Sequence, residues 1–180
     1  MTVELRTDRL ILRPYAVTDY DDSAAMWADA EVVRYIGNVP ATREQSWYRT
    51  LRYLGHWAAF GFGMWAVRDR DGAFVGDVGI TDFKRDLDPP LTALEAGWVV
   101  APRAQGQGYA TEALTAAIAW FERTQGAQPI ACMIDPPNAP SRRVAAKHGF
   151  IEDRRAVYHG EDVMIFIRPS RPARLFAGTH

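Results

Sequence analysis

The sequence has little cysteine, no long apolar run and no excess charge of either sign. Its one cysteine, Cys132, cannot form an internal disulfide or a zinc cluster of several thiolates, which fits a reducing compartment. No apolar stretch approaches the roughly 18 residues of a membrane-spanning helix, and the N-terminus is charged where a secretory signal needs an apolar core. We therefore expect a cytoplasmic protein with no membrane partner.

The charges nearly balance, with Lys+Arg 21 against Asp+Glu 22 and a net charge of -1. This balance gives no electrostatic reason to expect a nucleic acid partner. A hydrophobic share of 48% in 180 residues is enough for the core of one domain. We expect that domain to span residues 1–168, followed by a loosely held C-terminal tail at residues 169–180.

Hydrophobic periodicity and turn residues predict the order of the elements. Thr18 with Asp21, and Thr42 with Gln45, are typical of helix N-termini, and Asp71-Gly72 suits a hairpin turn. The order predicts a mixed α/β (α+β) domain. We expect strands at 9–14, 64–68, 73–80, 94–101, 129–134, 151–157 and 163–168, and helices at 18–30, 42–60, from Ala110 through at least Phe121, and at 141–148.

A glycine-rich turn joins the strand at 94–101 to the helix that begins at Ala110. Helix N-termini leave backbone N–H groups unpaired and carry partial positive charge, while Gly106 and Gly108 let an anion approach the backbone. The turn is therefore a candidate phosphate site. From the spacing alone, a plain flexible connection is an equally open interpretation.

Two common nucleotide motifs do not fit this turn. A dinucleotide fingerprint needs a third glycine and an acidic residue about 20 positions further on, but Thr111 replaces the glycine and Gln128 and Pro129 stand where the carboxylate would be. A P-loop needs a lysine, and none lies between Lys84 and Lys147. Both nucleotide classes are set aside.

Other chemistries lack their residues. The four histidines show no metal-ligand spacing, and neither Gly-x-Ser-x-Gly nor His-Glu-x-x-His occurs, so we expect no metal and no hydrolase site. Cys132 lies within an apolar strand, which is typical of a buried thiol rather than a nucleophile.

Several phrases recur together along the chain. Val100-Ala-Pro102 precedes Gln105-x-x-Gly108-x-Ala110; Arg103-x-x-Gly106-x-Gly108 fits the same pattern, but Pro102 favours the first register. The other phrases are Arg-Thr-Asp-Arg-Leu-Ile-Leu-Arg-Pro at 6–14, Glu-Ala-Gly-Trp at 95–98, Gly-Tyr-Ala-Thr-Glu-Ala at 108–113, Asn-Ala-Pro-Ser at 138–141 and Lys-His-Gly-Phe at 147–150. On these residues the sequence resembles the GNAT superfamily of acyl-CoA-dependent N-acetyltransferases, and within it the ribosomal-protein type called RimJ/RimL-like.

The resemblance implies a splayed, mostly antiparallel mixed sheet of about seven strands with flanking helices. Acetyl-CoA would lie between the fourth and fifth strands as the acyl donor, with no metal. The backbone of Val99 and Val100 would bind the pantetheine arm and the thioester carbonyl, and Asn138 would contact the cofactor. The pyrophosphate would lie on the turn and the helix start formed by Gln105, Gly106, Gln107, Gly108, Tyr109, Ala110 and Thr111.

Glu95 is the first candidate for the catalytic base, because the resemblance places a carboxylate on this strand. An attacking α-amine has a pKa of about 8, so a base, acting directly or through water, assists its deprotonation. The alternative for Glu95 is a carboxylate that is solvated or paired with an arginine. Weaker candidates are Asp77, Asp82 and Asp162.

The departing thiolate benefits from a proton donor. Many superfamily members place a tyrosine seven residues after the asparagine, but Ala145 stands there in this chain. Ser141 is the substitute candidate, and a capping role in the first helical turn is equally open for it.

The resulting expectation is an N-acetyltransferase that moves an acetyl group from acetyl-CoA directly to a primary amine, either a protein N-terminus or a small molecule. The alternative is a noncatalytic acyl-CoA-binding sensor, which the missing tyrosine would suit. A homodimer is left open, since dimers are common among proteins of this type.

Overall fold

The computed structural model describes residues 3–170, so the last ten residues of the expected tail lie outside the described part. Within these residues, one sheet of eight strands has the order β1-β2-β3-β4-β5-β6-β8-β7, and only β5 and β6 pair in parallel. The predicted mixed α/β fold with a mostly antiparallel sheet is confirmed. The strands are β1 (Leu5–Arg6), β2 (Leu10–Pro14), β3 (Met64–Asp69), β4 (Phe74–Thr81), β5 (Leu94–Val100), β6 (Ile130–Ile134), β7 (Ile151–Tyr158) and β8 (Glu161–Arg168).

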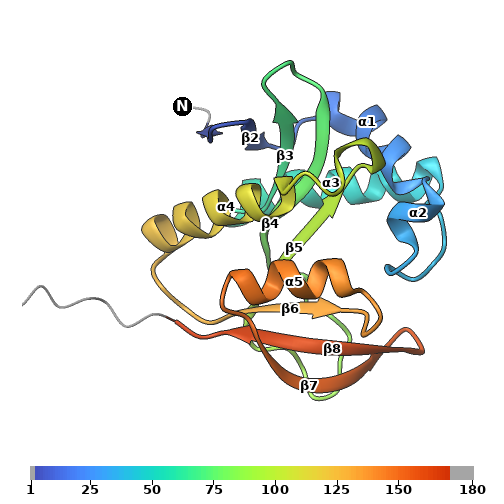
Figure 1. The fold of residues 1–180 in the computed structure, drawn as a ribbon, viewed down its shortest axis with the longest axis vertical. Helices are drawn as coiled ribbons and strands as arrows, with labels where there is room; N and C mark the ends of the chain where they lie inside the picture. The colour runs from blue at the N-terminus through green and yellow to red at the C-terminus, as the bar shows by residue number, and fades with distance from the viewer. Residues whose placement is uncertain (1–2, 171–180) are drawn as a thin grey trace, which may run out of the picture.

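Helices cover both faces of the sheet. Figure 1 shows α4 and α5 crossing the near face, while α3 crosses the far face behind the central strands. The helices are α1 (Tyr20–Trp27), α2 (Ala30–Val33), α3 (Arg43–Phe60), α4 (Tyr109–Gln125) and α5 (Ala139–Lys147), with 3-10 turns η1 (Val17–Asp19) and η2 (Pro102–Ala104).

Capping interactions explain where α3 begins and ends, and they show that the predicted start of the first helical segment is wrong. The Thr42 hydroxyl accepts a hydrogen bond from the Gln45 amide, the Gln45 side chain accepts one from the Thr42 amide, and the helix ends at Gly61 in the left-handed region. The predicted cap at Thr18 is wrong. The carboxylate of Asp19 accepts from the Ala16 amide instead and starts a 3-10 turn one residue earlier.

Each face of the sheet has its own apolar core. On the near face, Leu114, Phe121 and other residues of α4 pack against Val78 and Ile80 of β4. On the far face, Trp27 and its neighbours on α1 and α2 pack with α3 against β3 and the end of β5. The two cores fix β5 between two layers of helices.

The sheet forks between β5 and β6. Leu94 and Glu95 pair with Ile130 and Ala131, and the rest of β5 has no partner on that side. On its other side β5 stays paired with β4 as far as Val100. The fork predicted between the fourth and fifth strands is therefore present. No helix in residues 3–170 combines the length and the apolar composition that crossing a bilayer requires.

Candidate active site

The edge of β5 that faces the fork offers free backbone groups. The amide of Ala101 donates to the Val75 carbonyl at 2.9 Å, and Thr81 donates to the Glu95 carbonyl at 3.2 Å. Both bonds point toward β4. Because backbone groups alternate along a strand, those of Trp98 and Val100, beyond the pairing with β6, point into the fork instead.

Val99 and Val100 consequently face different ways. The Val99 carbonyl lies against Gly76 of β4, close enough that a Cβ on that glycine would clash with it. The Val100 carbonyl accepts from the side chain of Gln105 at 3.1 Å, which places it at the open edge. Of the two predicted amides, the one at Val100 is directed into the fork, and the one at Val99 is directed toward β4.

The turn from Gln105 into α4 is the candidate phosphate site and lies at the end of this edge. Gly106 and Gly108 both adopt positive φ, 75° and 80°, a conformation that side chains disfavour. Gly108 is the N-cap of α4 and no side chain caps the helix there, so the amides of Tyr109, Ala110 and Thr111 are not covered by a cap. The predicted phosphate-binding residues therefore meet at one helix start.

Arg9 fixes this turn from the N-terminal strands, and the sequence reasoning missed its role. Its guanidinium donates to the Gln107 carbonyl at 2.9 Å, lies 4.6 Å from the centroid of Tyr109, and pairs with Glu112 in the first turn of α4. The hydrogen bonds from Thr7 and Arg9 outweigh partial burial and lower the pKa of Glu112. The one sequence feature that includes Arg9 is the phrase at residues 6–14, to which no function was assigned.

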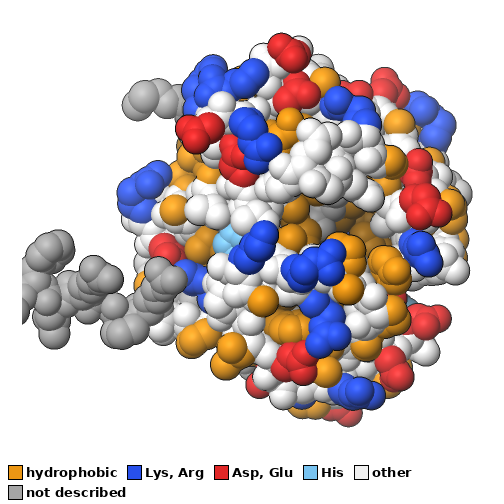
Figure 2. Space-filling model, in the orientation of Figure 1, with side chains coloured by type: hydrophobic (Ala, Val, Ile, Leu, Met, Phe, Trp, Pro, Cys, Tyr) orange, Lys and Arg blue, Asp and Glu red, His pale blue; other side chains and the backbone are white. Residues whose placement is uncertain are grey.

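The near face is hollowed beside the fork. Figure 2 shows orange hydrophobic side chains in a hollow between α4 and α5, with blue Lys and Arg side chains along its lower rim. The outer surface of α5 carries three exposed basic residues, Arg142, Arg143 and Lys147. This surface suits a ligand with an apolar arm and phosphate groups.

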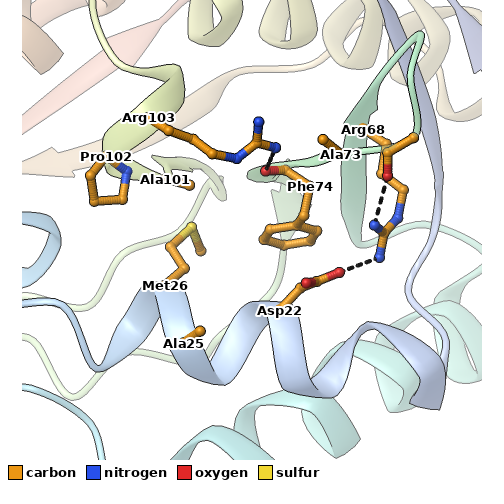
Figure 3. Close-up of a pocket in the computed structure, with 10 residues that line it drawn as sticks. Asp22, Ala25, Met26, Arg68, Ala73, Phe74, Ala101, Pro102 and Arg103 are labelled. Atoms are coloured by element: carbon orange, nitrogen blue, oxygen red, sulfur yellow. Dashed lines mark hydrogen bonds and ion pairs between the residues drawn. The ribbon is translucent and has the colours of Figure 1, made fainter.

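Arg103 lies on the opposite side of the turn. A cleft of about 570 Å³ lies between α1, the hairpin of β3 and β4, and η2. Figure 3 shows the Arg103 side chain reaching across this cleft, where it donates to the Phe74 carbonyl at 2.5 Å. This direction favours the register of the motif that starts at Gln105, whose side chain bonds to the open edge.

Glu95 is buried at the point where β5 leaves β6. Both of its carboxylate oxygens accept a hydrogen bond from Arg85 at 2.7 Å, and Arg85 also donates to the Tyr158 hydroxyl at 3.1 Å. Burial alone would lower the pKa of Arg85, but the bonds and the charge of Glu95 raise it above its usual value. The structure therefore shows Glu95 paired with an arginine, which was one of the alternatives to a catalytic base.

The weaker candidate carboxylates have separate partners. Asp77 is fully buried and accepts from the Tyr15 hydroxyl and from the Trp27 indole, the latter at 2.9 Å. Desolvation raises its pKa to about 6, although both of these hydrogen bonds oppose the shift. Asp82 pairs with Lys84 at 2.7 Å, and Asp162 is exposed at the start of β8.

Asn138 and Ser141 have different roles at the start of α5. The Asn138 side chain is the N-cap of α5 and accepts from the Ser141 amide at 3.1 Å. The Ser141 hydroxyl bonds to no other described residue, so the capping role belongs to Asn138 and the hydroxyl is free for a ligand.

The remaining reactive groups are dispersed. Cys132 is buried in β6, where desolvation and then the charge of Glu95 raise the pKa of the thiol above its usual value. Within residues 3–170, no three His, Cys, Asp or Glu side chains are grouped so that they could hold a metal ion.

The chain matches the acetyltransferase (GNAT) domain over residues 9–151. A curated relative, the [ribosomal protein uS5]-alanine N-acetyltransferase of Escherichia coli, is 28% identical over 160 residues, covering 82% of this chain and 78% of the relative. This relative agrees with the RimJ/RimL-like resemblance.

Solved structures give the same result. A protein assigned to the GNAT family from Bordetella pertussis is 30% identical with a TM-score of 0.80, covering 92% of this chain and 99% of that one. The spermidine N-acetyltransferase of Vibrio cholerae, solved with CoA and spermine, shares the fold at 16% identity, with a TM-score of 0.72 over 91% of this chain and 97% of that one. The chain therefore belongs to the GNAT acetyltransferase family and is an N-acetyltransferase.

Proposed function

We propose that the enzyme binds acetyl-CoA in the fork and transfers the acetyl group directly to a primary amine. The observation that carries the proposal is the unpaired edge of β5 that ends beside the uncapped start of α4. This edge presents backbone donors in a row, and the helix start presents a second group of donors for phosphate.

Each part of the cofactor has a matching part of the site in this proposal. The pyrophosphate lies on the amides from Gln105 to Thr111, and the pantetheine arm runs along the open edge of β5. The amide of Val100 donates to the thioester carbonyl, where negative charge develops as the amine attacks. The CoA complex of the Vibrio cholerae relative supports a cofactor of this kind in the shared fold.

The chemistry needs two proton transfers and no metal. The neutral amine attacks the thioester carbonyl carbon, the C–S bond breaks, the amine loses a proton and the CoA thiolate gains one. The free Ser141 hydroxyl is the proposed donor to the sulfur. Glu95 is the proposed acceptor of the amine proton through water, and it has to act while it is bonded to Arg85.

The acceptor is a primary amine, either a protein N-terminus or a small molecule. The Escherichia coli relative supports the first by its name and the Vibrio cholerae relative supports the second. The single buried cysteine agrees with catalysis in a reducing compartment such as the cytoplasm.

The test is release of free CoA thiol from acetyl-CoA in the presence of peptides with free N-termini, amino acids and polyamines, with mass spectrometry of each product. We expect at least one amine to gain a single acetyl group. An enzyme that binds acetyl-CoA but never releases thiol would instead behave as a sensor, and a covalent acetyl-enzyme would contradict direct transfer.

A further inference from the structure

Three arginines lie close together on the far face of the sheet, which is opposite the hollow between α4 and α5. Arg49 and Arg52 come from α3 and Arg85 from the loop after β4. The guanidinium carbons of Arg52 and Arg85 lie 4.6 and 4.5 Å from the centroid of the Phe83 ring. The guanidinium of Arg49 lies 3.7 Å from a ring of Trp27. We call these three residues the arginine cluster.

The cluster lies beside the residues of β5 at the fork. The side chains of Glu95, Gly97 and Val99 share one face of β5, because their partners on β4 are Thr81, Gly79 and Asp77. Arg85 bonds to Glu95 at one end of this face, and Trp27, under Arg49, bonds to Asp77 at the other end. The cluster therefore extends along the part of β5 where the proposed function puts the thioester. It lies on the face of the sheet that α4 does not cover.

The positive charge of the cluster is only partly neutralised. Glu95 satisfies Arg85 with two hydrogen bonds. One terminal nitrogen of Arg49 is buried and has no hydrogen-bond partner among the described residues. Desolvation lowers the pKa of Arg52, Tyr53 and Tyr158 oppose this shift, and the charges of Arg85 and Arg49 lower the pKa further. A buried guanidinium nitrogen without a partner, as in Arg49, is costly unless a ligand accepts a hydrogen bond from it, while the residue Arg52 is exposed.

We propose that the arginine cluster binds an anionic group on the acceptor, so that the enzyme acetylates amines that also carry a carboxylate or a phosphate. The planar guanidinium donates two parallel hydrogen bonds to either anion, which fixes orientation as well as charge. Arg49 and Arg52 supply these bonds, and Arg85, held by Glu95, adds positive charge beside them. This proposal rests on the proposed function, because the anion would place the amine against the thioester in the fork.

The test compares acceptor pairs that differ only in the anionic group. One panel holds α-amino acids and their amides, and the other holds aminoalkyl phosphates and the matching amino alcohols. Rates are referred to the concentration of neutral amine, because the substituents change the pKa of the ammonium group. We expect kcat/KM at least about tenfold higher for the anionic member of one panel, and the panel that responds identifies the anion.

Variants of the cluster then test whether it causes the preference for anionic acceptors. Arg49→Gln and Arg52→Gln should each reduce the preference at least about threefold through a higher KM, while acetyl-CoA affinity is unchanged. Arg123→Gln, at an exposed arginine in the last turn of α4, is the matched control and should leave the preference intact. Equal kcat/KM within both panels, or a preference that survives both variants, would overturn the proposal and leave the proposed function standing.

Calorimetry separates the remaining outcomes. If acetyl-CoA binds and no panel member is acetylated, the same pairs are titrated into the CoA-loaded enzyme. Tighter binding of the anionic member in the wild type, reduced by Arg52→Gln, supports the cluster, and equal or absent binding overturns it. Failure of acetyl-CoA to bind would contradict the proposed function itself.

Discussion

Glu95 and Arg85 form a two-point ion pair, with both carboxylate oxygens 2.7 Å from guanidinium nitrogens, at the residue where β5 parts from β6. The pair links β5, the strand proposed to bind the cofactor, to the arginine cluster on the far face. It also means that both carboxylate oxygens of Glu95 are already engaged by the guanidinium. The same carboxylate therefore holds Arg85 and is the candidate base.

The two tasks of Glu95 predict different results in two variants. If Glu95 accepts the amine proton, Glu95→Gln should lower kcat by about 100-fold, a typical contribution of a general base. Arg85→Gln should then retain much more of kcat at saturating acceptor, because the carboxylate is still present. Steady-state kinetics over pH 6 to 9 would measure both, with thermal unfolding as a check on folding.

Equal losses of kcat in the two variants would instead assign Glu95 a positioning role through Arg85. An unchanged kcat in Glu95→Gln would remove both roles. Acetyl-CoA affinity should stay within about twofold of the wild type in either variant, because neither side chain contacts the open edge of β5.

The glycine turn predicts a specific loss of cofactor affinity. Gly108 has φ 80° and ψ 4°, and Gly61 at the end of α3 has nearly the same conformation, φ 70° and ψ 11°. Alanine at either position should destabilise the fold by about 1 to 2 kcal/mol. Only Gly108→Ala should also weaken acetyl-CoA binding, by at least about tenfold, because Gly108 belongs to the turn whose amides are proposed to hold the phosphates, and its Cβ would lie 3.6 Å from the guanidinium of Arg9, which fixes that turn.

Urea unfolding and calorimetric titration of both variants would measure the two effects. Equal acetyl-CoA affinity in Gly108→Ala and Gly61→Ala would show that the turn does not hold the phosphates.

The buried carboxyl of Asp77 predicts a pH dependence of stability. Burial raises its pKa from 3.8 to about 6. Between these values the folded state keeps a proton that the unfolded state releases, so this group adds stability at low pH and loses it as the pH rises through 6. The stability of the wild type relative to Asp77→Asn should fall by roughly 1 kcal/mol between pH 5 and pH 8. Urea unfolding at the two pH values measures this, and a difference that is constant or of opposite sign would refute it.

The cysteine predicts chemical inertness of the native enzyme. Burial raises the pKa of the Cys132 thiol, so little thiolate forms near neutral pH. A disulfide reagent should titrate one thiol in denaturant and almost none in the native state over minutes. Rapid reaction of the native protein would show that β6 opens readily, and it would also interfere with the assay of CoA release.

The elements that could be predicted from the sequence are those that depend on interactions between neighbouring residues. The cap formed by Thr42 and Gln45, the apolar stripe of α4 and the hairpin turn at Asp71-Gly72 all depend on residues close together in the chain. The two-residue strand β1 was missed, because it forms only by pairing with β2. Short helices such as α2 were missed because four residues show no periodicity.

The site was predictable where one contiguous segment builds it and not where distant segments meet. The glycine turn was found because strand, turn and helix start follow one another. Arg9 reaches the turn from 98 positions away, and Arg85 bonds to Tyr158 across 73 positions, so no spacing rule could pair them. The arginine cluster was missed for the same reason, since α3 meets the loop after β4 only in the folded chain.

The most direct test is a calorimetric titration of the purified enzyme with acetyl-CoA, with succinyl-CoA, CoA and NADH titrated in parallel. We predict one acetyl-CoA per chain, a clear preference over NADH, and loss of most of the affinity in Gly108→Ala but not in Gly61→Ala. Absence of acetyl-CoA binding by the folded wild-type enzyme would contradict the assignment of the fork as the acyl-CoA site.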